Sequence, residues 1–579
     1  MAHPSARGCL SPALLLAFGF VAGPLTVPAD AQPALLVEDI NPGAASSSPQ
    51  DPEWLGGTLF FTADDGVLGA ELWKSDGTAA GTSLVKDLCA GPCSANPREK
   101  AMAGGLLFFA ADDGAGAVGV WKSDGTESGT VLLRGGFGSA AAPREITPLA
   151  DAVVFASGMS VFRADATGVV LVKDLGSTPL ILSGPSQLTA TGGAVFFTAT
   201  YLTGGSSVPS YQELYRTDGT TAGTVDVGYA GEELTLVGNA LYFVRRVFSA
   251  YLSTETLEKL DPQTNQRTAL RETSTRLIGE LAGSGSTLFF TSDSDLWKSD
   301  GTAAGTALVE AFVAASALTD VNHTLFFVAD DGTHGPEPWR SDGTSSGTSL
   351  VRDIVPGGEG SSPDRLTAGG SEAFFTADDG VHGRQLWVSD GTWFGTHLLQ
   401  EFQPGDVPLI APGPTGLFFA PSDASVGGEL WLLPAVPVYR LYLGATLEHL
   451  YTTDSYEDRV LGTVGWRREG VAFRVFPNDR AYGGETPIAL HRLYHPGVLQ
   501  HLWTTDANEA SVLSSSQGWM YEGVTGYVLV KQGPGTIPLY RMALASPPLH
   551  LWTTDPNEYQ VLSTQHGWIG EGISGHVLP

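Results

Sequence analysis

A short phrase recurs along residues 71–396, and this repetition constrains the fold more than any other feature of the chain. Its first full copy, ELWKSDGTAAGT, occupies residues 71–82. Close copies lie at 213–224, 295–306, 337–348 and 385–396, and a shortened copy lies at 120–130. Repetition at this level predicts an array of equal structural units, so the period decides the architecture.

Each unit also contains a pair of adjacent aromatic residues. The pairs occupy positions 60–61, 108–109, 196–197, 242–243, 289–290, 326–327, 374–375 and 418–419, and Phe155 stands alone in a degenerate unit. They define nine units that are spaced about 45 residues apart.

Within a unit, apolar and turn-forming segments alternate. Residues 58–62 are apolar on consecutive positions, which predicts a strand that is covered on both faces. Asp-Gly turns follow at 65–66 and 76–77, and further strands are expected at 71–74 and 83–87. With the apolar segment before the aromatic pair, this gives four short antiparallel strands. Four strands per period predict an all-β fold, a β-propeller over residues 32–434. The alternatives are a β-solenoid or a string of independent small domains.

The two ends of this region indicate that the ring closes. The last unit ends at 429–434 and lacks the final strand, whereas residues 34–40 (ALLVEDI) resemble that strand in other units. We therefore predict that 34–40 pairs with the last unit, which removes two exposed sheet edges. Nine blades are favoured, and eight remains open because the units around Phe155 and Phe243 are degenerate.

The repeated phrase resembles the bacterial family of exported proteins known by its ELWxxDGT consensus. The resemblance covers about residues 34–434, with intact motifs in six of the nine units. It implies a scaffold and no particular reaction.

A different repeat fills residues 435–579. Its three copies contain the segments 438–442, 490–494 and 539–543, then 449–454 (HLYTTD), 501–506 (HLWTTD) and 550–555 (HLWTTD), and finally Gly-Trp with Glu-Gly at 465–470, 518–523 and 567–572. Three β-rich copies predict a pseudo-threefold, β-trefoil-like domain. A short helical signal lies between the last two segments: residues 555–558 (DPNE) predict a helix start, which is unusual for a plain trefoil.

This second region resembles a repeat of unknown function that is marked by Tyr-Thr-Thr-Asp and Gly-Trp-x-x-Glu-Gly, and that is often appended to secreted hydrolases and surface proteins. The resemblance implies an accessory module, with sugar binding as the expected role.

The triplicated HLxTTD segments give the candidate ligand-binding residues. Aromatic rings stack on sugars, and Asp, Thr and His hydrogen-bond to hydroxyl groups. The candidates are His449, Tyr451, Asp454, His501, Trp503, Asp506, His550, Trp552 and Asp555. The structural alternative makes Trp466, Trp519 and Trp568 core residues and the three aspartates helix caps. A metal held by the three histidines is disfavoured, and we predict no metal and no cofactor.

The propeller region contains no convincing catalytic constellation. Paired aspartates at 64–65, 112–113, 330–331 and 378–379 would suit calcium, but turn formation alone explains them. Residues 343–347 match the G-x-S-x-G nucleophile motif, yet other copies carry Ala in the same place and the segment lies in a predicted hairpin.

The N-terminus and the charge favour export. Residues 1–31 read as a signal peptide that ends in a small-x-small site, although a membrane anchor is the competing interpretation. The formal net charge of −31 argues against nucleic acid as a partner. Cys89 and Cys93 predict a local disulfide in an oxidising compartment.

These features favour a secreted or cell-surface bacterial protein that is not an enzyme, is monomeric, and binds extracellular carbohydrate or an envelope protein. One alternative is a hydrolase or lyase whose site lies in the propeller channel, which rests on the fold alone. The other is a structural adhesion or matrix protein.

Overall fold

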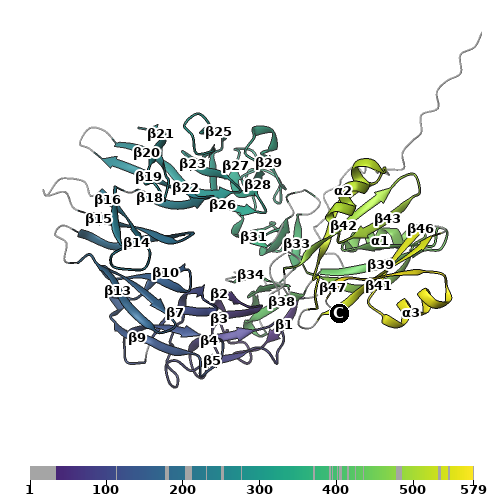
Figure 1. Cartoon of the computed structure of the whole chain (residues 1–579), viewed down its shortest axis with the longest axis horizontal. Coiled ribbons are helices and arrows are strands. Elements are labelled where there is room, and N and C mark those ends of the chain that lie inside the picture. The colour runs from purple at the N-terminus through teal and green to yellow at the C-terminus, as the bar shows by residue number, and fades with distance from the viewer. Residues whose placement is uncertain are drawn as a thin grey trace, which may run out of the picture.

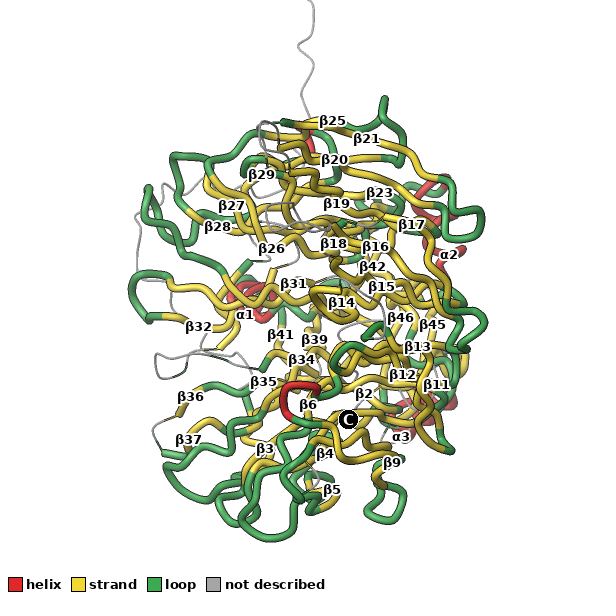
Figure 2. Tube along the Cα trace, turned by 90° about the vertical axis from the view of Figure 1, so that its left-hand side faces the viewer, coloured by secondary structure: helices red, strands yellow, loops and turns green. Residues whose placement is uncertain are grey.

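The computed structural model describes residues 34–577 apart from positions 113, 177–180, 202–210, 230, 249–252, 275–276, 370–371, 390, 392, 394–395, 401, 403–406, 408, 414–415, 424, 435, 477–485, 533–535 and 546–547. The predicted signal peptide therefore lies outside the described residues. Strands and loops make up nearly all of the chain, and the α-helices are short (Figure 2). None of the described helices is both long and apolar enough to cross a membrane.

The first domain is a ring of nine four-stranded antiparallel sheets within the described residues, which confirms the β-propeller prediction and favours nine blades over eight. Figure 1 shows the first strands of the sheets, such as β10, β14, β18 and β22, facing the centre of the ring. In pairing order from the inside, the first five sheets are β2 (Gln50–Leu55), β3 (Thr58–Asp64), β4 (Ala70–Ser75), β5 (Ser83–Lys86); β6 (Arg98–Ala103), β7 (Leu106–Asp112), β8 (Val118–Ser123), β9 (Val131–Phe137); β10 (Arg144–Leu149), β11 (Ala152–Ser157), β12 (Ser160–Asp165), β13 (Gly168–Asp174); β14 (Ile181–Thr191), β15 (Ala194–Tyr201), β16 (Tyr211–Thr217), β17 (Val225–Tyr229); and β18 (Glu232–Val237), β19 (Ala240–Phe248), β20 (Ser253–Leu260), β21 (Arg267–Thr273).

The remaining four sheets continue the ring. They are β22 (Ile278–Ser284), β23 (Thr287–Ser292), β24 (Asp295–Ser299), β25 (Ala307–Glu310); β26 (Ala314–Val321), β27 (Thr324–Asp330), β28 (Pro336–Ser341), β29 (Ser349–Leu350); β30 (Asp364–Gly369), β31 (Glu372–Asp378), β32 (Arg384–Ser389), β33 (His397–Gln400); and β34 (Ile410–Gly413), β35 (Gly416–Phe419), β38 (Leu430–Pro434), β1 (Leu35–Glu38). A small hairpin, β36 (Ser422–Asp423) with β37 (Gly427–Gly428), and two 3₁₀ turns, η1 (Ser139–Ala141) and η2 (Ser345–Gly347), lie in the connections.

The ninth sheet closes the ring as the sequence predicts. β1 pairs antiparallel with β38, with Leu36 opposite Trp431. Val37 is buried and belongs to the same apolar cluster as Phe61 of the first blade and Phe418 of the last. The two ends of the domain are therefore joined both by strand pairing and by a shared core.

The aromatic pair explains why each blade is covered on both faces. Phe60 packs with Phe109 of the second blade, whereas Phe61 packs with Phe418 of the ninth blade. Consecutive residues of one strand point to opposite faces, so each pair contributes one ring to each of two inter-blade cores.

The Asp-Gly-Thr part of the phrase forms a self-contained turn. Asp76 Oδ1 accepts hydrogen bonds from the backbone N–H (2.9 Å) and the hydroxyl (2.7 Å) of Thr78. The hydroxyls of Ser75 and Thr82 lie 2.7 Å apart across the base of the turn. A Cβ on Gly81 would lie 2.0 Å from Asp76 Oδ1, so a larger residue here would displace the Asp76 carboxylate from the turn. The recurring residues therefore form hydrogen bonds to one another within the turn.

The lysine of the phrase joins neighbouring blades. Lys74 Nζ donates to the carbonyl oxygen of Gly125 in the second blade at 2.8 Å. A Cβ on Gly125 would lie 3.0 Å from the Phe60 ring of the first blade, so the Asp-Gly turn of one blade rests on the aromatic residue of the preceding one.

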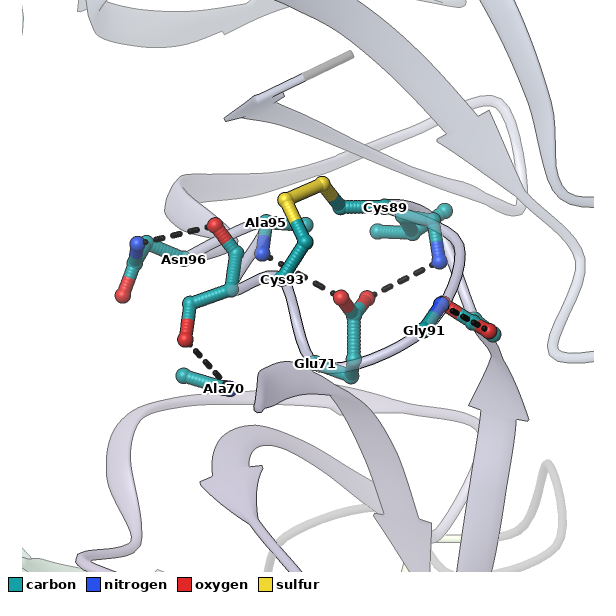
Figure 3. Close-up of a disulfide and its surroundings, with 10 residues drawn as sticks. Ala70, Glu71, Cys89, Gly91, Cys93, Ala95 and Asn96 are labelled. Atoms are coloured by element: carbon teal, nitrogen blue, oxygen red, sulfur yellow. Dashed lines mark hydrogen bonds between the residues drawn. A yellow bond between two sulfur atoms is a disulfide. The ribbon is translucent and has the colours of Figure 1, made fainter. Parts of the chain in front are cut away.

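The glutamate that opens the phrase anchors the connection to the next blade. The buried carboxylate of Glu71 accepts backbone hydrogen bonds from Leu88 (2.9 Å) and Ala95 (3.2 Å). These residues flank the loop closed by the Cys89–Cys93 disulfide, whose Cα atoms lie 5.4 Å apart (Figure 3). The predicted disulfide is thus present and closes the loop that Glu71 holds.

The second domain consists of three repeats, each with a three-stranded antiparallel sheet and one helix. They are β39 (Val436–Leu443), β40 (Glu448–Thr452), α1 (Ser455–Thr463), β41 (Arg467–Val475); β42 (Ile488–His495), β43 (Gln500–Thr504), α2 (Ala507–Ser516), β44 (Met520–Val528); and β45 (Ile537–Ala545), β46 (Pro548–Thr553), α3 (Pro556–Gln565), β47 (Ile569–Val577). The threefold repetition agrees with the prediction. The domain resembles a trefoil in symmetry, while a helix occupies part of each repeat.

Candidate functional site

Three aromatic residues that the sequence suggested as sugar-stacking groups lie instead at the centre of the second domain. Tyr451, Trp503 and Trp552 are each only 1% exposed. Their rings form a closed triangle of edge-to-face contacts, with centroid distances of 5.3, 5.8 and 5.9 Å. The prediction that these rings stack on a ligand is therefore wrong, because a ligand would have to displace the core to reach them.

The aspartates of the HLxTTD segments begin the three helices. Asp506 Oδ1 accepts from the backbone N–H groups of Asn508 and Glu509, and Asp555 Oδ1 accepts from that of Asn557. The third, Asp454, lies directly before α1. The structural alternative in the sequence analysis thus describes Asp506 and Asp555 correctly.

The three histidines lie on strands β40, β43 and β46, and two of them lie within 4 Å of a glutamate. His501 Nδ1 is 2.9 Å from Glu448 Oε1, and its Nε2 is 3.6 Å from Glu522. His449 Nε2 is 3.8 Å from Glu469. Burial, aided by a nearby arginine, lowers the pKa of both His449 and His550 to about 4, so both rings are neutral at neutral pH.

Three arginines connect the repeats in a cycle, and none of them was singled out by the sequence analysis. Each pairs with the glutamate of the Glu-Gly segment in its own repeat and with a glutamate in the first turn of the helix of the preceding repeat. The pairs are Arg440 with Glu469 and Glu558, Arg492 with Glu522 and Glu457, and Arg541 with Glu571 and Glu509.

We call each contact between neighbouring repeats a junction and number it by the repeat that supplies the arginine. The second junction, at Arg492, shows the geometry most completely. Arg492 Nη1 and Nη2 donate to the two oxygens of Glu457 at 2.7 and 2.8 Å, and its Nε donates to Glu522 at 2.8 Å. Burial raises the pKa of Glu457, but the hydrogen bonds and charge of Arg492 outweigh this, and the pKa lies below its usual value. The arginine and its two glutamates form an Arg–Glu–Glu triad, in which both carboxylates accept hydrogen bonds from one guanidinium in a partly buried site.

A cavity opens at two of these junctions, between the helix of one repeat and the sheet of the next. At the junction of α1 with β42 and β44 its volume is about 660 Å³, and its lining includes Thr453, Asp454, Arg492 and Val524. At the junction of α3 with β39 and β41 the volume is about 440 Å³, and Thr554, Asp555, Arg440 and Leu562 line it. Each cavity combines hydroxyl, carboxylate and guanidinium groups with an aliphatic wall.

Of the nine predicted site residues, the two cavities contain Asp454 and Asp555 but none of the histidines or central aromatics. The arginines and the Glu-Gly glutamates were visible in the sequence, because they recur in all three copies. Their pairing was not visible, since each arginine reaches a helix of another repeat.

A further cavity, of about 560 Å³, lies on the inner strands of the propeller. Asp51, Arg98, Glu99, Lys100 and Glu145 contribute to its lining. Two of its acidic side chains make structural contacts. Glu99 accepts a hydrogen bond from the backbone N–H of Glu145 at 2.6 Å, and Asp51 forms an ion pair with the buried Lys100 at 2.8 Å. The carboxylates therefore join neighbouring blades.

The paired aspartates of the propeller act in turns. Asp64 and Asp65 accept from the backbone N–H groups of Gly66 and Val67, and the pairs at 330–331 and 378–379 do the same in their blades. Asp113 of the fourth pair lies outside the described residues. Across the described part of the chain, no three acidic, His or Cys side chains come together as metal ligands would.

Comparison with known proteins gives one family match. Residues 435–578 match the model of a domain of unknown function, DUF5648. No curated protein matches the sequence.

Several solved structures align with part of this chain. A puromycin hydrolase aligns with 72% of this chain and 59% of its own length, at 11% identity and a TM-score of 0.36. A puromycin-hydrolysing peptidase of Mycobacterium tuberculosis aligns at 9% identity and a TM-score of 0.35, with 68% of this chain and 61% of its own covered. The β-propeller domain of the trilobed protease of Pyrococcus furiosus aligns at 11% identity and a TM-score of 0.30, with 52% and 96% covered. The chain thus spans about three fifths of the length of the two puromycin-hydrolysing enzymes, and with TM-scores below 0.5 these alignments support no conclusion about this chain.

Proposed function

We propose that this is an exported, non-catalytic binding protein whose C-terminal domain recognises carbohydrate in the cavities between its repeats, with the propeller as scaffold. The observation that carries the proposal is the repeated junction itself. The same Arg–Glu–Glu triad occurs three times, and at two junctions it borders a cavity lined with threonine and aspartate.

The chemistry of the cavities suits a polyhydroxylated ligand. Carboxylate and hydroxyl oxygens accept hydrogen bonds from sugar hydroxyls, and threonine hydroxyls also donate them. Aliphatic side chains such as Val524 offer contact to the apolar face of a sugar ring. Repetition at a fixed geometry also suits a polymer, because several weak sites on one domain gain affinity together.

The export part of the proposal rests on the N-terminal segment and on the disulfide. Residues 1–31 have the composition of a signal peptide, and a disulfide such as Cys89–Cys93 persists in oxidising compartments. Detection outside the cytoplasm of a mature chain that begins near Gln32 would support export. Detection of the chain only inside the cell, with residues 1–31 still attached, would contradict it.

The binding proposal is tested by a glycan array with the full chain and two variants. Val524→Trp places a large ring at the wall of the 660 Å³ cavity, where Val524 is 44% exposed. Val498→Trp is the matched control, because Val498 is 47% exposed in the same repeat and does not line that cavity. We expect the array to show a glycan ligand that Val524→Trp weakens and Val498→Trp does not. Absence of any glycan ligand, or equal effects of both variants, would contradict the proposal.

A hydrolase or lyase site in the propeller channel is the second candidate, because the inner cavity contains three carboxylates and two basic residues. The contacts of Asp51 and Glu99 favour a role in blade packing instead. A hydrolytic or eliminating activity of the full chain that is lost in Glu145→Gln would favour this candidate.

A further inference from the structure

One copy of the repeated phrase carries a large aromatic residue where the other copies do not. Trp393 lies between β32 and β33, at an exposed position that the other copies fill with small or polar side chains, namely Ala79, Glu127, Thr221, Ala303 and Ser345. Those five turns form without an aromatic ring, so the fold does not require one here. Trp393 is nevertheless 49% exposed, which leaves much of its ring open to solvent.

A second departure from the repeat lies directly beside this ring. Arg352 of the seventh blade takes the place that Lys86 has in the first blade, because each donates a hydrogen bond to the carbonyl oxygen of the last threonine of the phrase in the next blade. The guanidinium carbon of Arg352 lies 5.3 Å from the centroid of the Trp393 ring and 5.9 Å from that of the fully buried Trp387. One guanidinium thus holds the exposed ring against the core of the blade, which reduces the ordering cost of binding a ligand to it.

The exposed ring stands apart from other apolar side chains of its blade. Among the described residues of the eighth blade, the other exposed large apolar side chain is Val381, which lies in the turn at the opposite end of β32. A protein partner normally buries an aromatic residue at the centre of a contiguous apolar patch. A single flat ring instead matches the apolar face of one sugar ring. The charge of Arg352 beside the ring also disfavours a cationic ligand.

We propose that Trp393 is a carbohydrate-stacking residue of the propeller and binds one ring of a neutral oligosaccharide. Hexose rings with mostly equatorial hydroxyl groups, such as those of β-linked glucose, expose a face of C–H groups that stacks on an indole. This goes beyond the proposed function, because it gives the propeller a binding role of its own and uses no residue of the repeat junctions. A polymer that reached both domains would gain affinity from joint binding.

The proposal is tested by oxidation of the full chain with N-bromosuccinimide, which attacks exposed indoles, followed by peptide mass spectrometry. We expect Trp393 to be oxidised in the free protein and to be protected by at least one of the neutral hexamers of glucose, mannose and galactose. The buried Trp387 is the internal reference and should stay unmodified under both conditions. Sorbitol at the same concentration of hydroxyl groups should give no protection.

Calorimetric titration with the protecting hexamer then measures what the ring contributes. Trp393→Ala should weaken binding at one site about tenfold, because the stacking contact is lost. The melting temperature should stay nearly unchanged, since Ala79 and Ala303 occupy the same position in other blades. Thr221→Ala, at the equivalent exposed position of the fourth blade, is the matched control and should change neither quantity. Equal affinity of Trp393→Ala and the wild type would overturn the proposal.

The outcomes separate the Trp393 site from the proposed function. If an oligosaccharide binds the full chain and Trp393 is oxidised at an unchanged rate, the Trp393 site fails and binding at the junctions stands. If Trp393 is protected and Val524→Trp changes nothing, the Trp393 site stands and the junction proposal fails. If no oligosaccharide binds, both fail. If a polyproline peptide protects Trp393 and no oligosaccharide does, the ring belongs to a protein-binding surface and the inference is overturned.

Discussion

Replacement of Gly129 by alanine tests whether the repeated phrase is structural. A Cβ at this position would lie 2.0 Å from Asp124 Oδ1 and 2.2 Å from its Cγ, so the carboxylate must leave the turn. Asp124 Oδ1 would then lose two hydrogen bonds, from the backbone N–H of Thr126 (2.9 Å) and from its hydroxyl (2.7 Å). At about 1 kcal/mol for each bond, the turn is destabilised by roughly 2 kcal/mol.

The matched control lies in the same blade. Gly138 has φ −63° and ψ 153°, which alanine adopts readily, and nothing lies within 4 Å of a Cβ placed there. Hydrogen exchange followed by mass spectrometry should show amides of residues 124–130 exchanging about 30-fold faster in Gly129→Ala, the factor that corresponds to roughly 2 kcal/mol. Gly138→Ala should leave the exchange unchanged. Equal protection of the turn in both variants would refute the structural explanation of the phrase.

Three other perturbations address the closure, the buried charges and the junctions. Val37→Asp places an unpaired charge in the core that joins the first and last blades, so the urea midpoint should fall markedly, whereas Val67→Asp, at a position 69% exposed, should change it little; similar midpoints would contradict ring closure. Burial raises the pKa of Glu71 from 4.5 to about 7, so the folded state favours the protonated side chain. The contribution of Glu71 to the free energy of unfolding is therefore complete below pH 4.5 and is lost as pH rises to 7. The stability of the wild type relative to Glu71→Gln should therefore fall by up to about 3 kcal/mol over that interval, and a pH-independent difference would contradict it. Arg492→Ala leaves two glutamates unpaired and should destabilise the C-terminal domain by about 2–3 kcal/mol in thermal unfolding, whereas Arg467→Ala, whose side chain is 70% exposed, should cost under about 0.5 kcal/mol; equal losses would show that the triad adds no stability.

The propeller could be predicted from the sequence because its information is periodic. The aromatic pair and the Asp-Gly turn recur in register, so the strands of one blade predict those of the others. The closing strand β1 could be found because residues 34–40 repeat a segment that the last unit lacks. Each of these inferences needed only comparison of the chain with itself.

The candidate site could be predicted only in part, because threefold repetition does not say which face of a repeat points to the axis. Trp503 and Trp552 occupy the same position in their repeats, which is also the pattern expected of repeated binding residues on a surface. In the structure the two rings pack against each other in the core. The arginine triads depend on contacts between repeats, as in the pairing of Arg492 with Glu457. Such a contact follows from the angle between neighbouring repeats, which local propensity does not determine.

The most direct test of carbohydrate binding at the repeat junctions is a crystal structure of the full chain with a bound oligosaccharide that the glycan array identifies. The sugar should lie between α1 and β44, near Asp454 and Val524, and at the equivalent place between α3 and β41. A sugar found only in the propeller channel, or only on the second domain outside these two cavities, would contradict the proposal.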